Sequence, residues 1–116
     1  MSVLGVGVDI VFLPDFAKAM KKREFMKRVF SAKEIRFCKS RAFPLQHFAA
    51  RFAAKEATFK ALGKPSSYLN IEIAKSASGK PSIAFLPPRQ TGHPACQISL
   101  AHVKDYALAF VICTKQ

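Results

Sequence analysis

The chain has 116 residues, half of them hydrophobic and 22% charged. This length allows one hydrophobic core and predicts a single domain over residues 1–116, and the 11 phenylalanines exclude a disordered basic tail. The 19 basic residues outnumber the 7 acidic ones, and the net charge of +12 favours an anionic partner, which can be nucleic acid, membrane, acidic protein or a phosphorylated small molecule.

The first predicted element is a strand over residues 3–12. This segment is rich in Val and Ile, and its only charged residue is Asp9. Gly5 and Gly7 indicate that another part of the chain approaches the strand backbone closely.

A basic helix is predicted to follow. Pro14 suits its first turn, and Phe16, Met20 and Phe25 mark its apolar side. Its exposed side would carry six cationic residues, namely Lys18, Lys21, Lys22, Arg23, Lys27 and Arg28.

Two further helices have clear boundary signals. Ser31 and Glu34 form a capping-box pattern, which predicts a helix over residues 32–40. Pro44 begins the longest helical pattern and Gly63 ends it.

The long helix carries two charges at unusual places. Its apolar stripe consists of Leu45, Phe48, Phe52, Phe59 and Leu62. Lys55 projects from within this stripe and Glu56 lies at its edge, whereas Ala53 and Ala57 are predicted on the far, exposed face.

The C-terminal half predicts two strand pairs. Residues 71–73 and 83–86 form a hairpin around Ser78 and Gly79, and residues 97–101 pair with residues 106–114. The last strand is apolar on both faces, so we expect it at the centre of a sheet or at a subunit interface. One strand, two or three helices and four strands give an α+β fold, with antiparallel strands packed on the long helix.

Asp9 and Glu56 are the candidate metal ligands. Each has an ordinary alternative: Asp9 can bond a neighbouring turn, and Glu56 can form an ion pair with Lys60. Considered together, two carboxylates without a His or Cys companion suit Mg²⁺, which prefers oxygen ligands and completes its shell with water and phosphate oxygens.

A magnesium and phosphate site also needs cations. The long helix offers Arg51, Lys55 and Lys60, and His102 lies at a strand end beside a tight turn, where it can donate to a phosphate oxygen. His47 and His93 receive no role.

Four motifs resemble the small bacterial 4′-phosphopantetheinyl transferases of the holo-acyl-carrier-protein synthase family. They are GVGVDIV at residues 5–11, RFAAKEA at 51–57 with Lys60, Ala61 and Gly63, SGKP at 78–81, and SLAH at 99–102 followed by Tyr106 and Ala107. They run in order from residue 5 to about residue 112, and RFAAKEA is the most specific of them.

The resemblance implies a set of roles. Asp9 and Glu56 would bind Mg²⁺, while Lys55, Lys60 and His102 would lie at the phosphates of coenzyme A, with Glu56 and Lys60 taking part in catalysis. It also implies a homotrimer with active sites between subunits. Three positions depart from the family pattern: Phe12 and Asp15, where an acidic residue and then an arginine are common, and Ala101, where a hydroxyl residue is common.

The implied reaction moves the phosphopantetheine arm of coenzyme A to a serine of an acidic acyl carrier protein, a step of fatty acid biosynthesis. The basic helix would bind the carrier protein. Two other classes stay open: a small basic RNA- or ribosome-binding module, which also suits the charge, and an inactive scaffold.

The cysteines and the termini predict the location. Cys38, Cys96 and Cys113 are odd in number and lack a CxxC pair, so we expect buried free thiols in a reducing cytosol. The sequence shows no signal-peptide pattern and no apolar run of about 18 residues, which predicts a soluble, cytoplasmic protein without a membrane segment.

Overall fold

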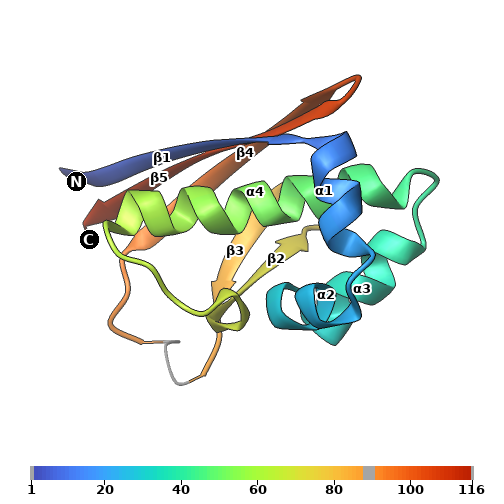
Figure 1. Cartoon of the computed structure of the whole chain (residues 1–116). Coiled ribbons are helices and arrows are strands. Elements are labelled where there is room, and N and C mark those ends of the chain that lie inside the picture. Colours follow the sequence, from blue (N-terminus) through green and yellow to red (C-terminus); the bar gives the residue numbers. More distant parts are fainter. Residues whose placement is uncertain (1, 88–90, 116) are drawn as a thin grey trace.

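A computed structural model describes residues 2–87 and 91–115 of the chain. The fold is α+β, as predicted, with strands and helices in the expected order (Figure 1). The elements are β1 (Ser2–Phe12), α1 (Leu13–Met20), α2 (Arg23–Val29), α3 (Ala32–Lys39), α4 (Pro44–Leu62), the 3₁₀ helix η1 (Tyr68–Asn70), β2 (Ile71–Lys75), β3 (Pro81–Phe85), β4 (Ala95–Val103) and β5 (Tyr106–Lys115).

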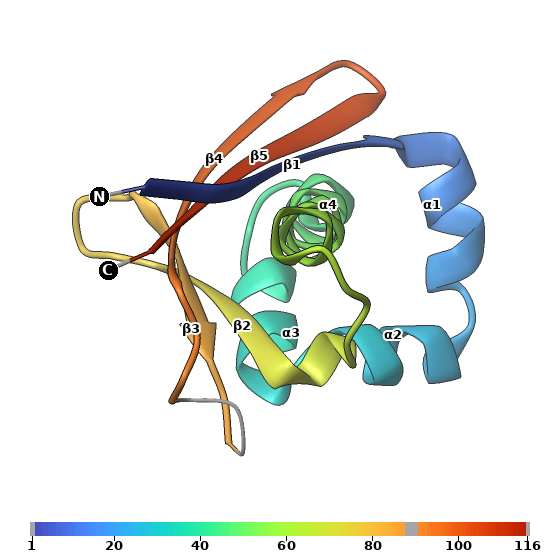
Figure 2. The same cartoon turned by 90° about the vertical axis from the view of Figure 1, so that its left-hand side faces the viewer.

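Helix α4 is the centre of the fold. The antiparallel sheet β1-β5-β4 covers one side of it, and the hairpin β2-β3 and the helices α1 to α3 surround the rest (Figures 1 and 2). The last strand, β5, lies between β1 and β4, which confirms the central position that its two apolar faces predicted.

The sheet and α4 pack closely because glycines of β1 lie directly against alanines of α4. A Cβ atom on Gly5 would overlap the carbonyl oxygen of Ala61, and one on Gly7 would overlap that of Ala57. The predicted close approach is therefore the approach of α4. The expected exposed position of Ala53 and Ala57 is wrong, because both are fully buried.

The predicted basic helix is two helices, α1 and α2, separated at Lys21 and Lys22. The break lets Phe16 and Phe25 pack against the same ring, that of Phe52, at centroid distances of 5.4 and 5.7 Å. In one straight helix these two phenylalanines would be about 13 Å apart along the axis. The six cationic residues are exposed on this helix pair.

The other helix boundaries agree with the sequence. Ser31 and Glu34 form the predicted capping box at the start of α3. Gly63 ends α4 with a positive φ of 77°, which glycine adopts without a steric penalty.

The outer face of the sheet is apolar and uncovered. Neither view shows an element over the side of the sheet opposite α4 (Figures 1 and 2). Val6, Val8 and Ile10 of β1 are 51 to 60% exposed there, next to Tyr106 and Phe110 of β5. Monomeric proteins rarely expose such a continuous apolar patch.

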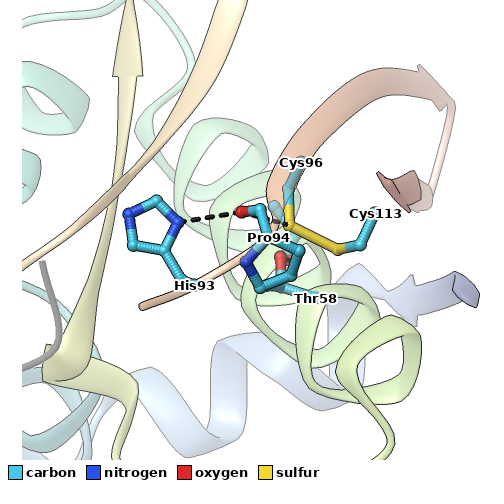
Figure 3. The surroundings of a disulfide bond; sticks show 6 residues. Thr58, His93, Pro94, Cys96 and Cys113 are labelled. Atoms are coloured by element: carbon cyan, nitrogen blue, oxygen red, sulfur yellow. Dashed lines mark hydrogen bonds between the residues drawn. A yellow bond between two sulfur atoms is a disulfide. The ribbon is translucent and has the colours of Figure 1, made fainter. Parts of the chain in front are cut away.

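The prediction of free thiols is wrong for two of the three cysteines. Cys38 is a buried free thiol, but Cys96 and Cys113 form a disulfide between β4 and β5, beside Thr58 and Pro94 (Figure 3). The two residues are direct partners in the antiparallel register, with Cα atoms 4.2 Å apart.

None of the helices described is long and apolar enough to span a lipid bilayer.

Candidate active site

Asp9 and Lys60 form an ion pair between β1 and α4. Lys60 Nζ lies 3.1 Å from Asp9 Oδ1 and also donates to the carbonyl oxygen of Val8, at 3.0 Å. The Asp9 side chain is 18% exposed, whereas that of Lys60 is 56% exposed. The alternative pair of Lys60 with Glu56 is not formed, because the ammonium group reaches across to β1 instead.

Glu56 lies beside this pair, one helical turn before Lys60. Burial is the main cause that raises the pKa of Asp9, the ammonium of Lys60 opposes it, and the negative charge of Glu56 adds to it. Two carboxylates whose charges act on each other in this way form one electrostatic site. The structure therefore joins Asp9 to Lys60 and leaves Glu56 near enough for its charge to act on Asp9.

Glu56 and Lys60 line a shallow hollow, and Asp9 is not among its lining residues. Its volume is about 330 Å³, and Glu56, Phe59, Lys60 and Lys64 contribute to its walls. An anionic ligand in the hollow would meet Lys60 of α4 and Lys64, which lies just beyond the C-terminal end of this helix. The charge there therefore suits a phosphorylated molecule.

The donor set fits a hard divalent cation. Within residues 2–87 and 91–115, no cluster of three or more His, Cys, Asp or Glu side chains is suited to a metal. A cation at Asp9 and Glu56 would therefore have two protein carboxylates and would take its other ligands from water or from a substrate, as Mg²⁺ commonly does. It would also relieve the repulsion between the two carboxylates.

Lys55 lies elsewhere. Its side chain is fully buried, and Nζ donates to Glu34 Oε1 at 2.8 Å and to the carbonyl oxygens of Val29 and Tyr68 at 2.7 and 3.1 Å. These bonds use all three of its protons. In this structure Lys55 therefore has no free proton for the phosphate contact that the resemblance implied, because it is buried in the core and paired with Glu34.

His102 lines a different cavity, of about 410 Å³. Arg51, Lys75 and Lys80 are in the same wall, so this cavity is cationic. His47 also lines it, although it received no role from the sequence. Burial, and then the charges of Arg51 and Lys75, lower the pKa of His47 below its ordinary value of 6.5.

Arg51 is the most buried cation of this cavity, at 4% exposure. Its guanidinium group stacks on Phe37, with Cζ 4.4 Å from the ring centroid, and Nη1 makes a long bond of 3.5 Å to the carbonyl oxygen of His47. Nε has no hydrogen-bond partner within the part of the chain that the structure describes. The positive charge of Arg51 adds to the cationic wall of this cavity, which suits an anionic ligand.

The two cationic regions lie on different sides of α4. His47 precedes Glu56 by nine residues, and at about 100° per residue the two side chains project from opposite sides of the helix. One chain therefore joins Asp9, Glu56 and Lys60, but it does not bring His102 to them.

The structure adds residues that sequence patterns did not identify. Lys75 and Lys80, on and beside the hairpin β2-β3, line the cationic cavity. Tyr68 donates a hydrogen bond of 2.9 Å to Glu56 Oε1. The available signals were weak: a basic hairpin loop for the lysines and a lone tyrosine in a polar loop for Tyr68.

The chain matches the family model of the 4′-phosphopantetheinyl transferase superfamily over residues 5–111. It is 38% identical to the holo-[acyl-carrier-protein] synthase of Protochlamydia amoebophila, over 94% of this chain and 96% of the relative. It is 40% identical to that of Thermodesulfovibrio yellowstonii, over 95% and 97% of the two chains.

Solved structures of the same enzyme are similar throughout. The holo-(acyl-carrier-protein) synthase of Bacillus anthracis, in complex with CoA (3′,5′-ADP), has a TM-score of 0.87 and 29% identity, and the match covers 100% of both chains. The Helicobacter pylori enzyme in complex with coenzyme A has a TM-score of 0.84 and 31% identity, with 94% of this chain and 99% of that chain covered.

Proposed function

Because the chain belongs to the 4′-phosphopantetheinyl transferase superfamily, and within it to the holo-[acyl-carrier-protein] synthases, we propose that it transfers the 4′-phosphopantetheine group of coenzyme A to a serine of an apo acyl carrier protein. Adenosine 3′,5′-bisphosphate is the second product. The observation that carries this proposal onto named residues is the ion pair of Asp9 with Lys60 beside Glu56, with Glu56 and Lys60 lining one open hollow.

The chemistry is a phosphoryl-type transfer. The serine oxygen forms a bond to the phosphorus that carries pantetheine, and the bond from that phosphorus to the oxygen of the leaving nucleotide breaks. The proton of the serine passes to a base, for which Glu56 is the proposed group. Before this step, Lys60 binds a pyrophosphate oxygen and holds the pyrophosphate in line with the attacking serine oxygen. Positioning and charge stabilisation therefore provide most of the rate.

Asp9 and Glu56 are the proposed ligands of Mg²⁺. When bound, the ion supplies positive charge against the pyrophosphate. Lys60 has two roles in this proposal: it balances the charge of Asp9 in the ion-free protein, and it turns toward the phosphates when substrate is bound. Its exposed side chain leaves it free to make this change.

The cationic cavity around His102 is the proposed site for other phosphates of coenzyme A. His102, Arg51, Lys75 and Lys80 line this cavity, and their charge favours an anion there. Because this cavity and the Asp9–Glu56 cluster lie on different sides of α4, we propose that each active site combines the cluster of one subunit with His102 of a neighbour.

A homotrimer provides this combination. The exposed apolar face formed by Val6, Val8, Ile10, Tyr106 and Phe110 is the proposed subunit interface, since association would remove it from water. A closed ring of three subunits would bury the same patch in every copy and repeat the same active site three times.

The carrier protein is proposed to bind the basic surface of α1 and α2, whose charges complement an acidic partner. This surface adjoins the cluster: α2 packs against η1, and the positive charge of Arg28 acts on Tyr68, the partner of Glu56. Replacing Lys21, Lys22 and Arg23 together by Glu should raise KM for the carrier protein and leave coenzyme A binding nearly unchanged. Equal losses in both would contradict the docking role.

The remaining parts of the proposal concern the setting. The chain forms one transferase domain, acts in the cytoplasm where coenzyme A and its carrier protein meet, and supplies fatty acid biosynthesis with holo carrier protein. The family match favours this enzyme over the nucleic-acid-binding module and over the inactive scaffold, which the charge alone left open.

The direct test is the mass of the acceptor. Apo acyl carrier protein is incubated with coenzyme A, Mg²⁺ and the purified chain, and its intact mass is then measured. The proposal expects a gain equal to one phosphopantetheine group with Mg²⁺ and none with a chelator present. An unchanged carrier protein in both samples would overturn it, and salt-dependent retention of RNA in its place would favour the nucleic-acid-binding class.

A further inference from the structure

Tyr68 is held at both ends by two consecutive residues of α4. Its hydroxyl group donates to Glu56 Oε1 at 2.9 Å, and its carbonyl oxygen accepts from Lys55 Nζ at 3.1 Å. Lys55 reaches this carbonyl from inside the core, whereas Glu56 faces the hollow. The short helix η1 is thereby fixed against α4 at the level of the cluster.

Packing and charge restrict the phenol further. Its ring lies between those of Phe52 and Phe59, with centroid distances of 5.7 and 5.6 Å. Lys55 itself is fixed by Glu34 and by the carbonyl oxygen of Val29. Two neighbouring aromatic rings and a buried ammonium group whose three protons are all hydrogen-bonded therefore determine where the hydroxyl of Tyr68 lies.

The hydroxyl can act only as a donor toward an ionised Glu56, because a carboxylate carries no proton to give. A phenol is protonated at neutral pH, so this hydroxyl has a proton to donate. One carboxylate oxygen of Glu56 is thus engaged. The residues that the structure describes form no other hydrogen bond to the side chain of Glu56. Its second carboxylate oxygen, Oε2, is therefore available to another ligand.

We propose that Tyr68 is a positioning residue for Glu56: its hydroxyl holds Oε1, so that Oε2 faces Asp9 and the shared divalent cation. Lys55 contributes indirectly, because it fixes the backbone of Tyr68. The inference rests on the proposed function, since it takes Glu56 to be a metal ligand. Hydrogen bonds that orient ligating side chains typically change metal affinity by 10- to 100-fold when they are removed.

The test measures metal binding without substrate. Mn²⁺ serves as the probe, and electron paramagnetic resonance of the free ion gives its dissociation constant for the full chain. Tyr68→Phe removes the hydroxyl and keeps the ring, so we expect about tenfold weaker Mn²⁺ binding or more, with little change in the melting temperature. In the Glu56→Gln background, the same substitution should have no further effect, because the group that it orients no longer binds the ion.

A matched variant controls for local loosening. Ser66→Ala removes the bond that Asn70 donates to Ser66 Oγ and so weakens the same segment without touching Tyr68. This variant should bind Mn²⁺ like the original chain. Equal weakening in Ser66→Ala and Tyr68→Phe, or an unchanged dissociation constant in Tyr68→Phe, would overturn the inference. Unchanged binding in Glu56→Gln would instead overturn the proposed metal site.

Discussion

Lys55 and Glu34 form a fully buried ion pair, with Nζ 2.8 Å from Oε1. The pair connects α4 to α3, and the second carboxylate oxygen of Glu34 accepts from the backbone of Ile73 in β2. A charge that the sequence suggested for ligand binding therefore joins three elements of the core and supports the residue next to it, Glu56.

Removing one partner of this pair should destabilise the protein strongly. Lys55→Met would leave the carboxylate of Glu34 buried without its counter-charge, and we expect a loss of about 3–5 kcal/mol in the free energy of unfolding. Urea denaturation measures this quantity. Adding Glu34→Gln to the same chain should restore part of the loss, because the uncompensated charge is removed. A loss below about 1 kcal/mol, the range of an exposed ion pair, would contradict the account.

The disulfide should make stability depend on redox conditions. Cys96 and Cys113 are separated by 17 residues, and closing a loop of this length contributes about 3 kcal/mol in the chain-entropy model. We expect the oxidised chain to melt at a higher temperature than the reduced chain. The double variant Cys96→Ala and Cys113→Ala should not respond to reductant.

Cys38 provides the internal reference for this experiment. Burial raises its pKa to about 11, so its thiol should react slowly with alkylating agents in the native protein. Alkylation of all three thiols after unfolding without reductant, or equal melting temperatures in both redox states, would show that the pair is not bonded.

Coenzyme A binding should take up a proton at mildly acid pH. The pKa of His47 is lowered by burial and by nearby cations, among them Arg51 and Lys75. Phosphates in this cavity would oppose those charges and raise the pKa, so the bound state holds more protons and the affinity should increase as the pH falls toward 6.5. Calorimetry in buffers of different ionisation enthalpy counts the protons. The uptake should disappear in His47→Gln, and equal uptake in that variant would assign the proton to another group.

A site shared between subunits predicts complementation. Glu56→Gln and His102→Ala should each be inactive in transfer, because each removes one half of every site. Mixed trimers contain some sites in which both halves are intact, and random assortment predicts recovery of roughly a quarter of the original activity. If mixing after dissociation gives no recovery, an active site does not combine Glu56 of one subunit with His102 of another.

The sequence predicted most of the fold because its boundary signals are local. The capping box of Ser31 and Glu34, the C-terminal Gly63 and the alternation of the last strands each depend on neighbouring residues. Hydrophobic periodicity was less reliable for α4. Other elements surround this helix, so its alanine face is buried as well as its apolar stripe. The alanine face is buried because β1 packs closely against it, with Gly7 against Ala57.

The tertiary contact partners of a residue were harder to predict than its position within a helix or strand. Lys55 was expected in the apolar stripe, but nothing local to it indicated Glu34, 21 residues away. The cysteine pair did have a signal: in a hairpin that turns at Lys104 and Asp105, residues 96 and 113 are direct partners. Tyr68 contacts Glu56 only because η1 folds back on α4, and a pattern within one element cannot show this.

The central claim is that Glu56 acts at the reacting centre, and its most direct test is the rate of carrier-protein modification by Glu56→Gln. This substitution keeps the shape and removes the charge. Followed by intact mass with Mg²⁺ and coenzyme A in excess, transfer should fall by about 10²-fold or more, while the circular dichroism spectrum and melting temperature stay native. Transfer within a few-fold of the original rate would contradict the claim.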